Sequence, residues 1–356
     1  MNEREINFMA DLMNKMDRKA SVAGDIINDY LSHHKNIDKA DFLNVVWGVI
    51  RAYARLKWAY PDDNWQTRVQ KFVEKGVPDV SNAPQYIQWE VPEWFLSHVP
   101  EPEQELPTLM DSAPIVLRAI GNRDEILNDL QQEGLNVEPC EQSPYGIILK
   151  NYANLKNTNV WKKGLIEIQD EGAQLLALEI GVHSGESVFD FCAGAGGKSL
   201  IFAQIMQNKG QILAYDITPK KLFELVKRAT RAQIKIIQIA TQLPDPDKKF
   251  DHVVVDAPCS SCGTWRRSPN MRWHLTEKQL KHITRTQGEI LNRAEQYVKP
   301  GHFLSYITCS LTIDENEQQI EQFLKAHPNY EVILQKRYSP FRTNTDGFFL
   351  CKMRKV

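Results

Sequence analysis

Residues 187–199 read S-V-F-D-F-C-A-G-A-G-G-K-S, and this stretch decides the fold. Its first six residues form a short β-rich run, and a helical pattern, SLIFAQIMQNKG, covers residues 199–210. Gly194, Gly196 and Gly197 lie between the two. Glycines let the backbone approach a ligand closely, and the N-terminus of the following helix offers free N–H groups. The stretch therefore predicts a ligand-binding loop between a strand and a helix.

Downstream of this loop, strand and helix patterns alternate to the end of the chain. The expected strands are QILAYD (211–216), IKIIQI (234–239), FDHVVVDAP (250–258), HFLSYITCS (302–310) and GFFLCKMR (347–354). Helices are expected from Pro219, over about 276–297 and over 314–326. This alternation is typical of a doubly wound α/β sheet, whose ligands bind at the carboxyl ends of the strands.

Upstream of the loop, the sequence predicts three smaller regions. Residues 1–78 have helical periodicity, and residues 79–114 are rich in proline, which indicates a linker with short helices such as PEWFLSHV (92–99). Residues 115–156 contain IVLRAI, NRDEILNDLQQEG and YGIILK, a small α/β unit of βαβ type. Residues 157–356 then form the doubly wound domain.

Composition is that of an ordinary soluble globular protein, with 42% apolar and 25% charged residues. No run of about 18 apolar residues is present, so no membrane span is expected. The charged N-terminal stretch MNEREINFMADLMNKMDRK lacks the apolar segment of a secretory signal. We therefore expect a cytoplasmic monomer whose six cysteines are reduced. Because the net charge is only −2, an RNA-binding function must depend on local basic patches.

Two familiar phosphate-binding patterns do not fit the glycine loop. Gly197-Lys198-Ser199 matches half of a P-loop, but the first glycine of that motif would fall at Cys192. The spacing also differs from the G-x-G-x-x-G of dinucleotide-binding proteins. A P-loop nucleotide hydrolase, the alternative from another enzyme class, is therefore disfavoured.

Asp216 ends the second expected strand, and two interpretations of it remain open. A carboxylate there can accept hydrogen bonds from ribose hydroxyls, or it can cap the helix that begins at Thr218-Pro219. Together with the glycine loop, Asp216 favours a nucleoside cofactor. The pair does not distinguish a dinucleotide from S-adenosylmethionine.

Two cysteines follow neighbouring strands of the expected sheet. Cys259 comes directly after FDHVVVDAP, and Cys309 ends the strand that follows it. Parallel strands deliver both thiols to the same sheet edge, beside the glycine loop. A thiolate that adds to carbon 6 of cytosine makes carbon 5 nucleophilic enough to accept a methyl group, and an acid such as Asp256 can stabilise the charge that develops on the ring. These residues alone leave open which thiol is the nucleophile.

Cys259 and Cys262 form a C-x-x-C pair, which in other proteins binds zinc or performs redox chemistry. Zinc needs about two more ligands, and no second C-x-x-C or paired histidine accompanies this one. A redox pair would open a helix, whereas residues 264–270 predict a loop. We therefore expect no metal.

Four ordered motifs resemble the Fmu/Sun family of RNA cytosine-5 methyltransferases, and most closely its bacterial small-subunit ribosomal RNA branch. VFDFCAGAGGKS (188–199) is similar to the family's cofactor loop D-x-C-A-A-P-G-G-K-T. DAPCSSCGTWRRSPNMRW (256–273) resembles D-A-P-C-S-G-x-G-x-x-R-R-x-P, and YITCSLTIDENEQQI (306–320) resembles T-C-S…E-N-E. DGFFLCKMRK (346–355) is similar to the terminal strand, and GLIEIQDEGAQLLAL (164–178) to the segment before the cofactor loop.

This resemblance implies a class I methyltransferase fold, S-adenosylmethionine as cofactor and RNA as partner. It implies that Cys309 is the nucleophile, that Cys259 assists product release and that Asp256 positions the base. The cofactor contacts it implies are Cys192, Ala193, Gly194, Ala195, Gly196, Gly197, Lys198, Asp216, Lys221 and Asp256. Gln242 stands near the position of a third cofactor acid, where its amide can still hydrogen-bond the adenine but carries no charge.

The resemblance also bears on the RNA. VVWGVIRAYARL (45–56) looks like part of a NusB-like RNA-binding domain, residues 115–156 like an RRM-like subdomain, and ribosomal RNA is the expected target with transfer RNA as the alternative. A non-catalytic RNA-binding protein would have been suggested by loss of a thiol, but both are present. The expected RNA contacts are Arg266, Arg267 and Arg272, while Trp265 and Trp273 stack on RNA or pack the loop. A second, weaker candidate patch is Trp161, Lys162 and Lys163.

Overall fold

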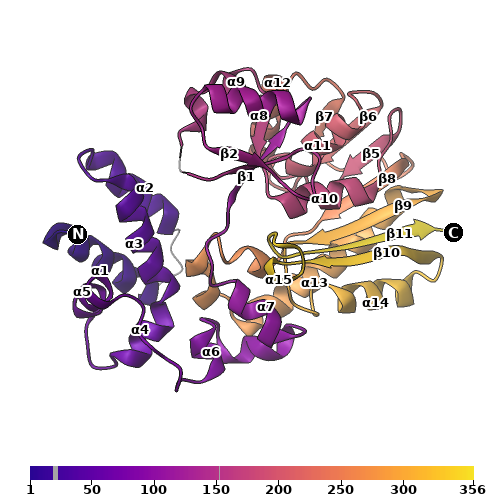
Figure 1. Cartoon of the computed structure of the whole chain (residues 1–356). Coiled ribbons are helices and arrows are strands. Elements are labelled where there is room, and N and C mark those ends of the chain that lie inside the picture. The colour runs from indigo at the N-terminus through magenta and orange to yellow at the C-terminus, as the bar shows by residue number, and fades with distance from the viewer. Residues whose placement is uncertain (19–22, 152) are drawn as a thin grey trace. The chain divides into compact units, whose positions relative to one another are not determined.

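The computed structural model describes residues 1–18, 23–151 and 153–356, which group into two compact units (Figure 1). The first, called the helical unit below, contains residues 1–112 and 264–280. The second, called the sheet unit, contains residues 113–263 and 281–356. The predicted domain 157–356 is therefore interrupted, because the loop after Cys259 packs with the N-terminal helices.

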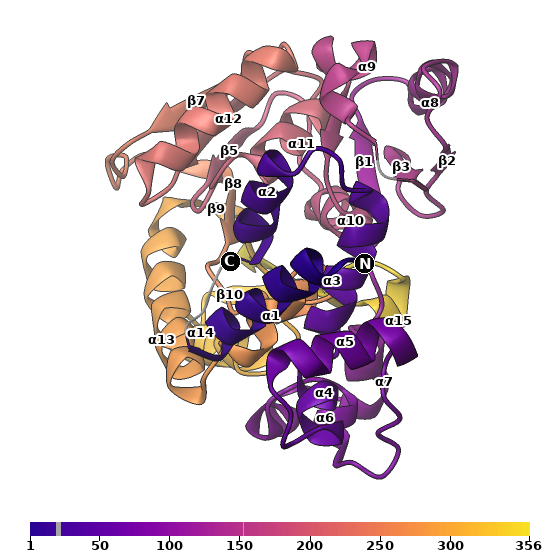
Figure 2. The ribbon, with the colours of Figure 1, turned by 90° about the vertical axis from the view of Figure 1, so that its left-hand side faces the viewer.

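The N-terminal half of the helical unit is built from amphipathic helices. They are α1 (Glu3–Arg18), α2 (Ala23–His33), α3 (Lys39–Arg51), α4 (Tyr53–Ala59) and α5 (Trp65–Lys75). Asp38 caps α3 by accepting the N–H groups of Ala40 and Asp41. α1 packs beside α5 (Figure 2), and their buried apolar stripes form one core that includes Leu12, Phe42 and Val69.

The proline-rich segment is not the linker that the sequence predicted. It forms α6 (Gln85–Gln88), η1 (Glu93–His98) and α7 (Pro102–Thr108), and it buries Val91, Phe95, Leu106 and Leu109 completely. Pro84, Pro92 and Pro102 stand at or just before the first turns of these short helices, where a missing N–H costs nothing, while Pro107 lies within α7. Residues 79–112 therefore belong to the folded helical unit.

Residues 264–280 complete the helical unit. η3 (Cys262–Thr264) leads into this stretch and η4 (Pro269–Trp273) lies within it. Trp265 is fully buried against Phe95, with ring centroids 4.7 Å apart, and Trp273 lies 5.5 Å from the ring of Tyr53. Both tryptophans therefore pack the loop, as one of the two interpretations expected.

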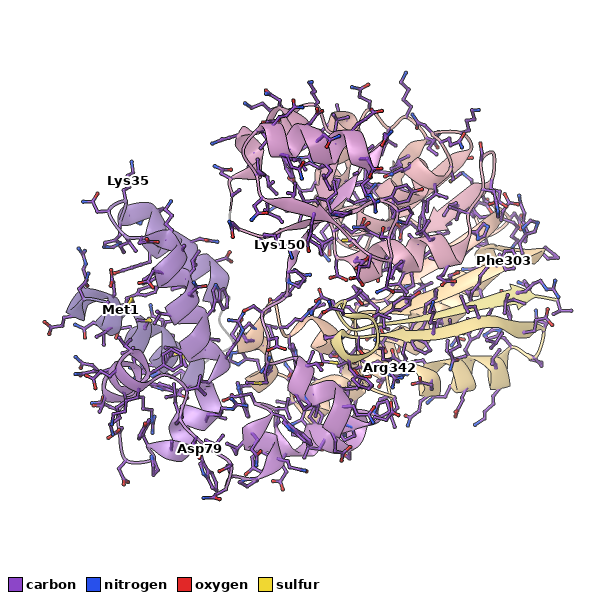
Figure 3. All side chains as sticks on the ribbon, in the orientation of Figure 1. Met1, Lys35, Asp79, Lys150, Phe303 and Arg342 are labelled. Carbon is purple, nitrogen blue, oxygen red and sulfur yellow. The ribbon has the colours of Figure 1, made fainter. Side chains whose placement is uncertain are left out.

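The sheet unit begins with a small antiparallel sheet of strand order β2-β3-β1-β4. Its elements are β1 (Ile115–Ala119), α8 (Arg123–Gln132), β2 (Val137–Pro139), β3 (Gly146–Leu149), η2 (Leu155–Asn157), α9 (Asn159–Lys162) and β4 (Ile166–Ile168). Lys150, labelled in Figure 3, follows β3. It forms an ion pair with Glu138 of β2.

Two details of this small sheet differ from the prediction. β2 was not expected, and because it intervenes, β3 runs antiparallel to β1 instead of forming a simple βαβ unit. β4 pairs with β1, so the sheet extends past the predicted boundary at residue 156. The strand order is that of the split βαβ arrangement.

The large sheet has strand order β10-β11-β9-β8-β5-β6-β7 within the described residues. Its strands are β5 (Ser187–Asp190), β6 (Gln211–Tyr215), β7 (Ile237–Ala240), β8 (Phe250–Asp256), β9 (Val298–Thr308), β10 (Tyr330–Tyr338) and β11 (Phe348–Lys355). The five strands from β5 to β9 pair in parallel, and β11 enters antiparallel between β9 and β10. β10 was not predicted, whereas the other strands were.

Helices cover both faces of the large sheet, which confirms the doubly wound fold. They are α10 (Glu171–Ile180), α11 (Gly197–Ile205), α12 (Pro219–Arg231), α13 (Glu277–Ala294), η5 (Glu295–Tyr297), α14 (Glu317–Ala326) and α15 (Pro340–Thr343). Figure 1 shows α10, α11 and α12 on one face and α13 and α14 on the other, each burying an apolar core against the strands. Across the described ranges, no helix has the length and apolar character needed to cross a membrane.

Candidate active site

The glycine loop joins β5 to α11, as expected. Gly194 and Gly196 have φ of +53° and +87°, in the left-handed region that side chains with a Cβ avoid. A Cβ on Gly196 would also lie 2.5 Å from Cγ of Leu225. The loop can therefore hold this path only with glycine at residue 196.

A cavity of about 350 Å³ opens at the carboxyl ends of β5, β6 and β8. Its lining residues are Phe191, Cys192, Gly194, Tyr215, Asp216, Ile217, Lys221, Asp256, Pro258, Thr286, Glu289, Ile290 and Arg293. Of the expected cofactor contacts, Cys192, Gly194, Asp216, Lys221 and Asp256 are among them. The structure thus gathers five of the expected residues around one cavity.

The other expected cofactor contacts are not among the lining residues. Gly196 and Gly197 begin α11, and Ala193 and Ala195 flank the turn before it. Lys198 is turned toward Asp256, with its Nζ 3.1 Å from Oδ2. Gln242 is exposed in the loop beyond β7. The amide that we expected beside the adenine therefore lies outside the cavity wall.

Sequence reasoning missed one wall of the cavity. Thr286, Glu289, Ile290 and Arg293 of α13 line it. Their spacing of three, four and seven residues places them on one face of a helix, and this periodicity was the available signal. Ile217 was also missed, although an apolar side chain that is 83% exposed directly after Asp216 is unusual.

Asp216 accepts two backbone hydrogen bonds before α12 begins, and its contact with a ribose stays a prediction. Its Oδ2 accepts the N–H of Gly194 at 2.9 Å, and its Oδ1 accepts the N–H of Thr218 at 2.7 Å. The carboxylate therefore ties the glycine loop to the turn before α12. Asp216 also lines the cavity. Each of its carboxylate oxygens can accept a second hydrogen bond, so both remain available to a ligand there.

The two thiols meet as the parallel strands predicted. β8 and β9 pair in parallel, and Sγ of Cys259 lies 3.2 Å from Sγ of Cys309. The hydrogen bond from Cys259, aided by Ser261 and Lys198, lowers the pKa of Cys309 below its usual value despite burial. The same hydrogen bond, together with burial and the carboxylate of Glu315, raises the pKa of Cys259. The surrounding charges thus favour a thiolate on Cys309 and a thiol on Cys259.

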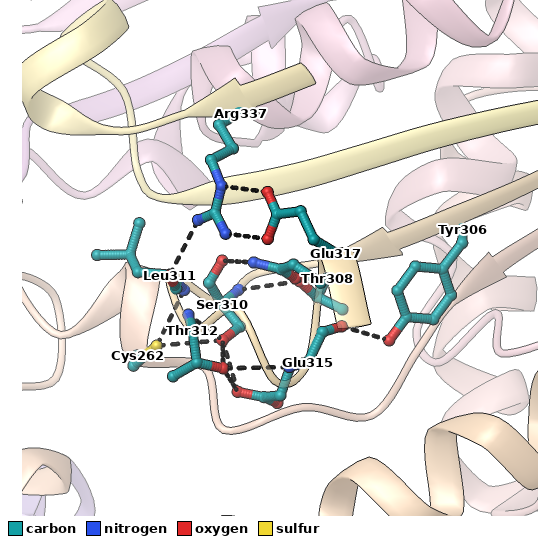
Figure 4. A network of polar contacts seen from close by, with 10 residues as sticks. Cys262, Tyr306, Thr308, Ser310, Leu311, Thr312, Glu315, Glu317 and Arg337 are labelled. Carbon is teal, nitrogen blue, oxygen red and sulfur yellow. Dashed lines mark hydrogen bonds and ion pairs between the residues drawn. The ribbon is translucent and has the colours of Figure 1, made fainter. Parts of the chain in front are cut away.

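Glu315 links the loops that carry both thiols, and Figure 4 shows its contacts with Ser310 and Thr312. Its buried carboxylate accepts the N–H and the hydroxyl of Ser260, which follows Cys259. It also accepts the hydroxyl groups of Ser310, which follows Cys309, and of Thr312, and an N–H of Gln287. Sequence reasoning quoted this glutamate in a motif but gave it no role.

The arginines expected to contact RNA are mostly buried. Arg272 is 1% exposed, donates to the carbonyl oxygen of Leu109, and lies near Glu90, whose pKa burial raises to about 7. Arg266 is 3% exposed, and Arg267 is half-buried. Burial makes Arg266 and Arg272 parts of the packing of the helical unit, so the expectation that they reach RNA phosphates is wrong for this conformation.

The second candidate patch is only partly exposed. Lys162 and Lys163 are exposed, whereas the ring of Trp161 lies 3.8 Å from the guanidinium of Arg231. Trp161 therefore packs on a neighbouring cation within the sheet unit.

Comparison with known proteins agrees with this geometry. A "Probable ribosomal RNA small subunit methyltransferase B" of Bacillus subtilis is 28% identical over 98% of this chain and 80% of its own length. The solved structure "Crystal Structure of PH0851" matches with a TM-score of 0.81 and 21% identity, over 100% of this chain and 99% of that one. NSun6 from Pyrococcus horikoshii, solved with SFG, matches with a TM-score of 0.66 and 17% identity, over 74% and 97%.

The family itself is shown by the chain's own residues. Residues 176–354, about half of the chain, match the family described as 16S rRNA methyltransferase RsmB/F. This stretch contains the glycine loop, both cysteine loops and the strands of the large sheet. It confirms the resemblance to the Fmu/Sun family and its bacterial small-subunit branch. The chain belongs to the 16S rRNA methyltransferase RsmB/F family and is an RNA methyltransferase.

Proposed function

We propose that this enzyme transfers a methyl group from S-adenosylmethionine to carbon 5 of a cytosine in ribosomal RNA, through a covalent adduct of Cys309 with carbon 6. The observation that carries the proposal is the pair of sulfur atoms 3.2 Å apart at a strand edge whose neighbouring residues line the cavity. Methyl transfer to an oxygen or to an exocyclic nitrogen needs no thiol. A carbon 5 target does, because that carbon is a poor nucleophile until carbon 6 is attacked.

The residues of the cavity fit S-adenosylmethionine. Asp216 offers carboxylate oxygens for ribose hydroxyls, and Tyr215, Ile217 and Ile290 supply apolar surface for a purine. Gly194 also lines the cavity, and because glycine has no side chain, a ligand can approach the backbone closely there. When bound there, the cofactor supplies an electrophilic methyl group. The P. horikoshii neighbour solved with SFG supports a small-molecule site in this fold.

Each thiol has a separate part in the proposed reaction. Cys309 adds as a thiolate to carbon 6, and carbon 5 then takes the methyl group. Asp256, held by Lys198, hydrogen-bonds the base edge while charge develops on the ring. Once it has given up its own proton to water, Cys259 takes the proton from carbon 5. The electron pair of that C–H bond re-forms the double bond between carbons 5 and 6, and Cys309 leaves as a thiolate. This division of roles is supported by the neighbouring charges, since Lys198 lowers the pKa of Cys309 and Glu315 raises the pKa of Cys259.

Ribosomal RNA is the proposed substrate because the relative from B. subtilis carries a small-subunit ribosomal RNA name over nearly the whole of this chain. The exposed lysines Lys162 and Lys163 are available for phosphates. We further propose that the helices of residues 1–78 contribute to RNA binding, as in the NusB-like domain that they resemble.

The test of this function is the variant Cys259→Ala. Without the group that removes the carbon 5 proton, methylated RNA should stay joined to Cys309. A denaturing gel of the variant with small-subunit RNA and S-adenosylmethionine should show a protein–RNA band that the wild type clears within its turnover time. Bisulfite sequencing of the RNA should locate one protected cytosine. Release of methylated RNA at the wild-type rate would contradict the proposal.

Asp216→Ala should weaken binding of S-adenosylmethionine by about 10-fold to 100-fold, because a hydrogen bond to a charged group contributes about 1.5–3 kcal/mol. Asp216→Asn should lose less, since one amide oxygen still accepts a hydrogen bond. Isothermal titration calorimetry of the free enzyme measures both affinities. Unchanged affinity in the alanine variant would remove Asp216 from the cofactor site.

A further inference from the structure

Ser261 holds a backbone conformation that serine normally avoids. Its φ is +57°, in the left-handed region, where a residue with a Cβ is strained. The family motif that residues 256–269 resemble has glycine at this position, and glycine adopts such a φ without strain. The chain therefore has a serine side chain at a position whose backbone conformation favours glycine.

The hydroxyl of Ser261 lies against the two sulfur atoms. Its Oγ accepts a hydrogen bond from Sγ of Cys309 at 3.4 Å and lies 4.0 Å from Sγ of Cys259. Ser260, the preceding residue, turns its hydroxyl to the carboxylate of Glu315 instead. Of the two adjacent serines, one thus supports the loop and the other contacts the reacting sulfur.

We propose that Ser261 is a further catalytic residue, whose hydroxyl turns to donate a hydrogen bond to the sulfur of Cys309 once that thiol is ionised. The inference deepens the proposed function, on which it rests for the identity of the nucleophile. No covalent bond to Ser261 forms or breaks, and its hydroxyl keeps its proton throughout. The hydrogen bond from Ser261 stabilises the thiolate of Cys309 before it attacks carbon 6. The same hydrogen bond stabilises that thiolate again when the adduct breaks down.

The charges around Cys309 define how the loss of this donor would act. The hydrogen bond from the thiol of Cys259 lowers the pKa of Cys309 and burial raises it, while Asp256 at the end of β8 raises it and Lys198 of α11 lowers it. Ser261 adds a second hydrogen bond that favours the charged form. Removing the hydroxyl leaves the other groups in place, so the pKa of Cys309 should rise and less thiolate should exist at neutral pH.

Two variants separate the hydroxyl from the backbone strain. Ser261→Gly removes both, and Ser261→Ala removes the hydroxyl alone. The rate of alkylation of Cys309 by iodoacetamide is followed by mass spectrometry of its peptide from pH 5 to pH 10. In both variants the midpoint of the pH–rate profile should rise by about one pH unit, so that alkylation at pH 7 is about 10-fold slower than in the wild type. The glycine variant should also unfold at the same or a higher temperature than the wild type.

Gln233→Gly is the matched control, because Gln233 is exposed at the end of α12 and also has a left-handed φ of +55°. Relief of strain there should leave the alkylation profile unchanged. A wild-type profile in both Ser261 variants would overturn the inference, whatever their stability. Alkylation needs no RNA, so this outcome is distinct from a failure of the proposed function, in which the wild type itself would leave cytosine carbon 5 unmethylated.

Discussion

Cys309→Ala is expected to lower the rate of methyl transfer by about 10⁴-fold or more, because the first bond of the proposed reaction forms at its sulfur. The variant should also form no covalent band with RNA. Cys309 does not appear among the residues that line the cavity, so its affinity for S-adenosylmethionine should stay within about twofold of wild type. The measurements are single-turnover transfer of labelled methyl groups, denaturing gels and calorimetry.

Cys140→Ala is the control for this variant. Cys140 is buried and lies between β2 and β3 of the small sheet, whereas Cys259 and Cys309 follow β8 and β9 of the large sheet. Its removal should leave methyl transfer near the wild-type rate. Comparable loss in both variants would indicate general damage to the fold. Substantial activity of Cys309→Ala, with Cys140→Ala also active, would mean that another group attacks carbon 6.

Glu315→Ala is expected to destabilise the sheet unit by about 3–5 kcal/mol and to abolish activity. The reason is that the buried hydroxyl and N–H groups that donate to this carboxylate would lose their acceptor. Glu315→Gln is the sharper variant. Oε2 of Glu315 accepts the hydroxyls of Ser260 and Ser310, whereas Oε1 accepts the N–H of Ser260 and an N–H of Gln287. An amide replaces one of these two oxygens with an NH₂ donor, so one of the two groups of donors loses its acceptor. We expect a loss of about 1–3 kcal/mol in unfolding free energy.

The activity of Glu315→Gln tests whether this glutamate positions the thiols. Because Ser260 and Ser310 each follow a reactive cysteine, their displacement should separate the sulfur atoms and slow transfer by about 100-fold while cofactor affinity is kept. Glu317→Gln is the control: Glu317 lies two residues on and pairs with Arg337 at a partly exposed site (Figure 4). It should change stability by about 1 kcal/mol or less. Equal activity of Glu315→Gln and wild type would leave Glu315 a structural residue only.

The elements predicted correctly were those that depend on the pattern of apolar residues along a few neighbouring positions. Alternating apolar strands and helices fixed the doubly wound sheet, and every strand of it was expected except β10. β10 alternates weakly, with Glu331, Gln335 and Lys336 among its residues, because it lies at the edge of the sheet and is largely solvent-exposed. Its register comes from pairing with β11, which no local pattern records.

The weaker predictions concerned residues whose role depends on distant partners. The prolines of residues 79–114 suggested an open linker, but Phe95 and Leu109 are buried in the helical unit. Arg272 carried a charge that suggested RNA, yet its guanidinium is buried and donates to the carbonyl of Leu109. Charge and proline content describe local preference, whereas burial is decided by what the rest of the chain brings against a residue.

The amino-acid sequence by itself determined the sheet, the glycine loop and the strand-end positions of Cys259 and Cys309, since hydrophobic period and motif spacing are properties of neighbouring residues. Only the tertiary structure decided that Glu315 joins the two cysteine loops, that α13 forms a wall of the cavity and that the hydroxyl of Ser261 contacts the sulfur of Cys309. These contacts join residues up to about a hundred positions apart, or depend on the side-chain direction within a turn. Packing, and not local preference, sets them.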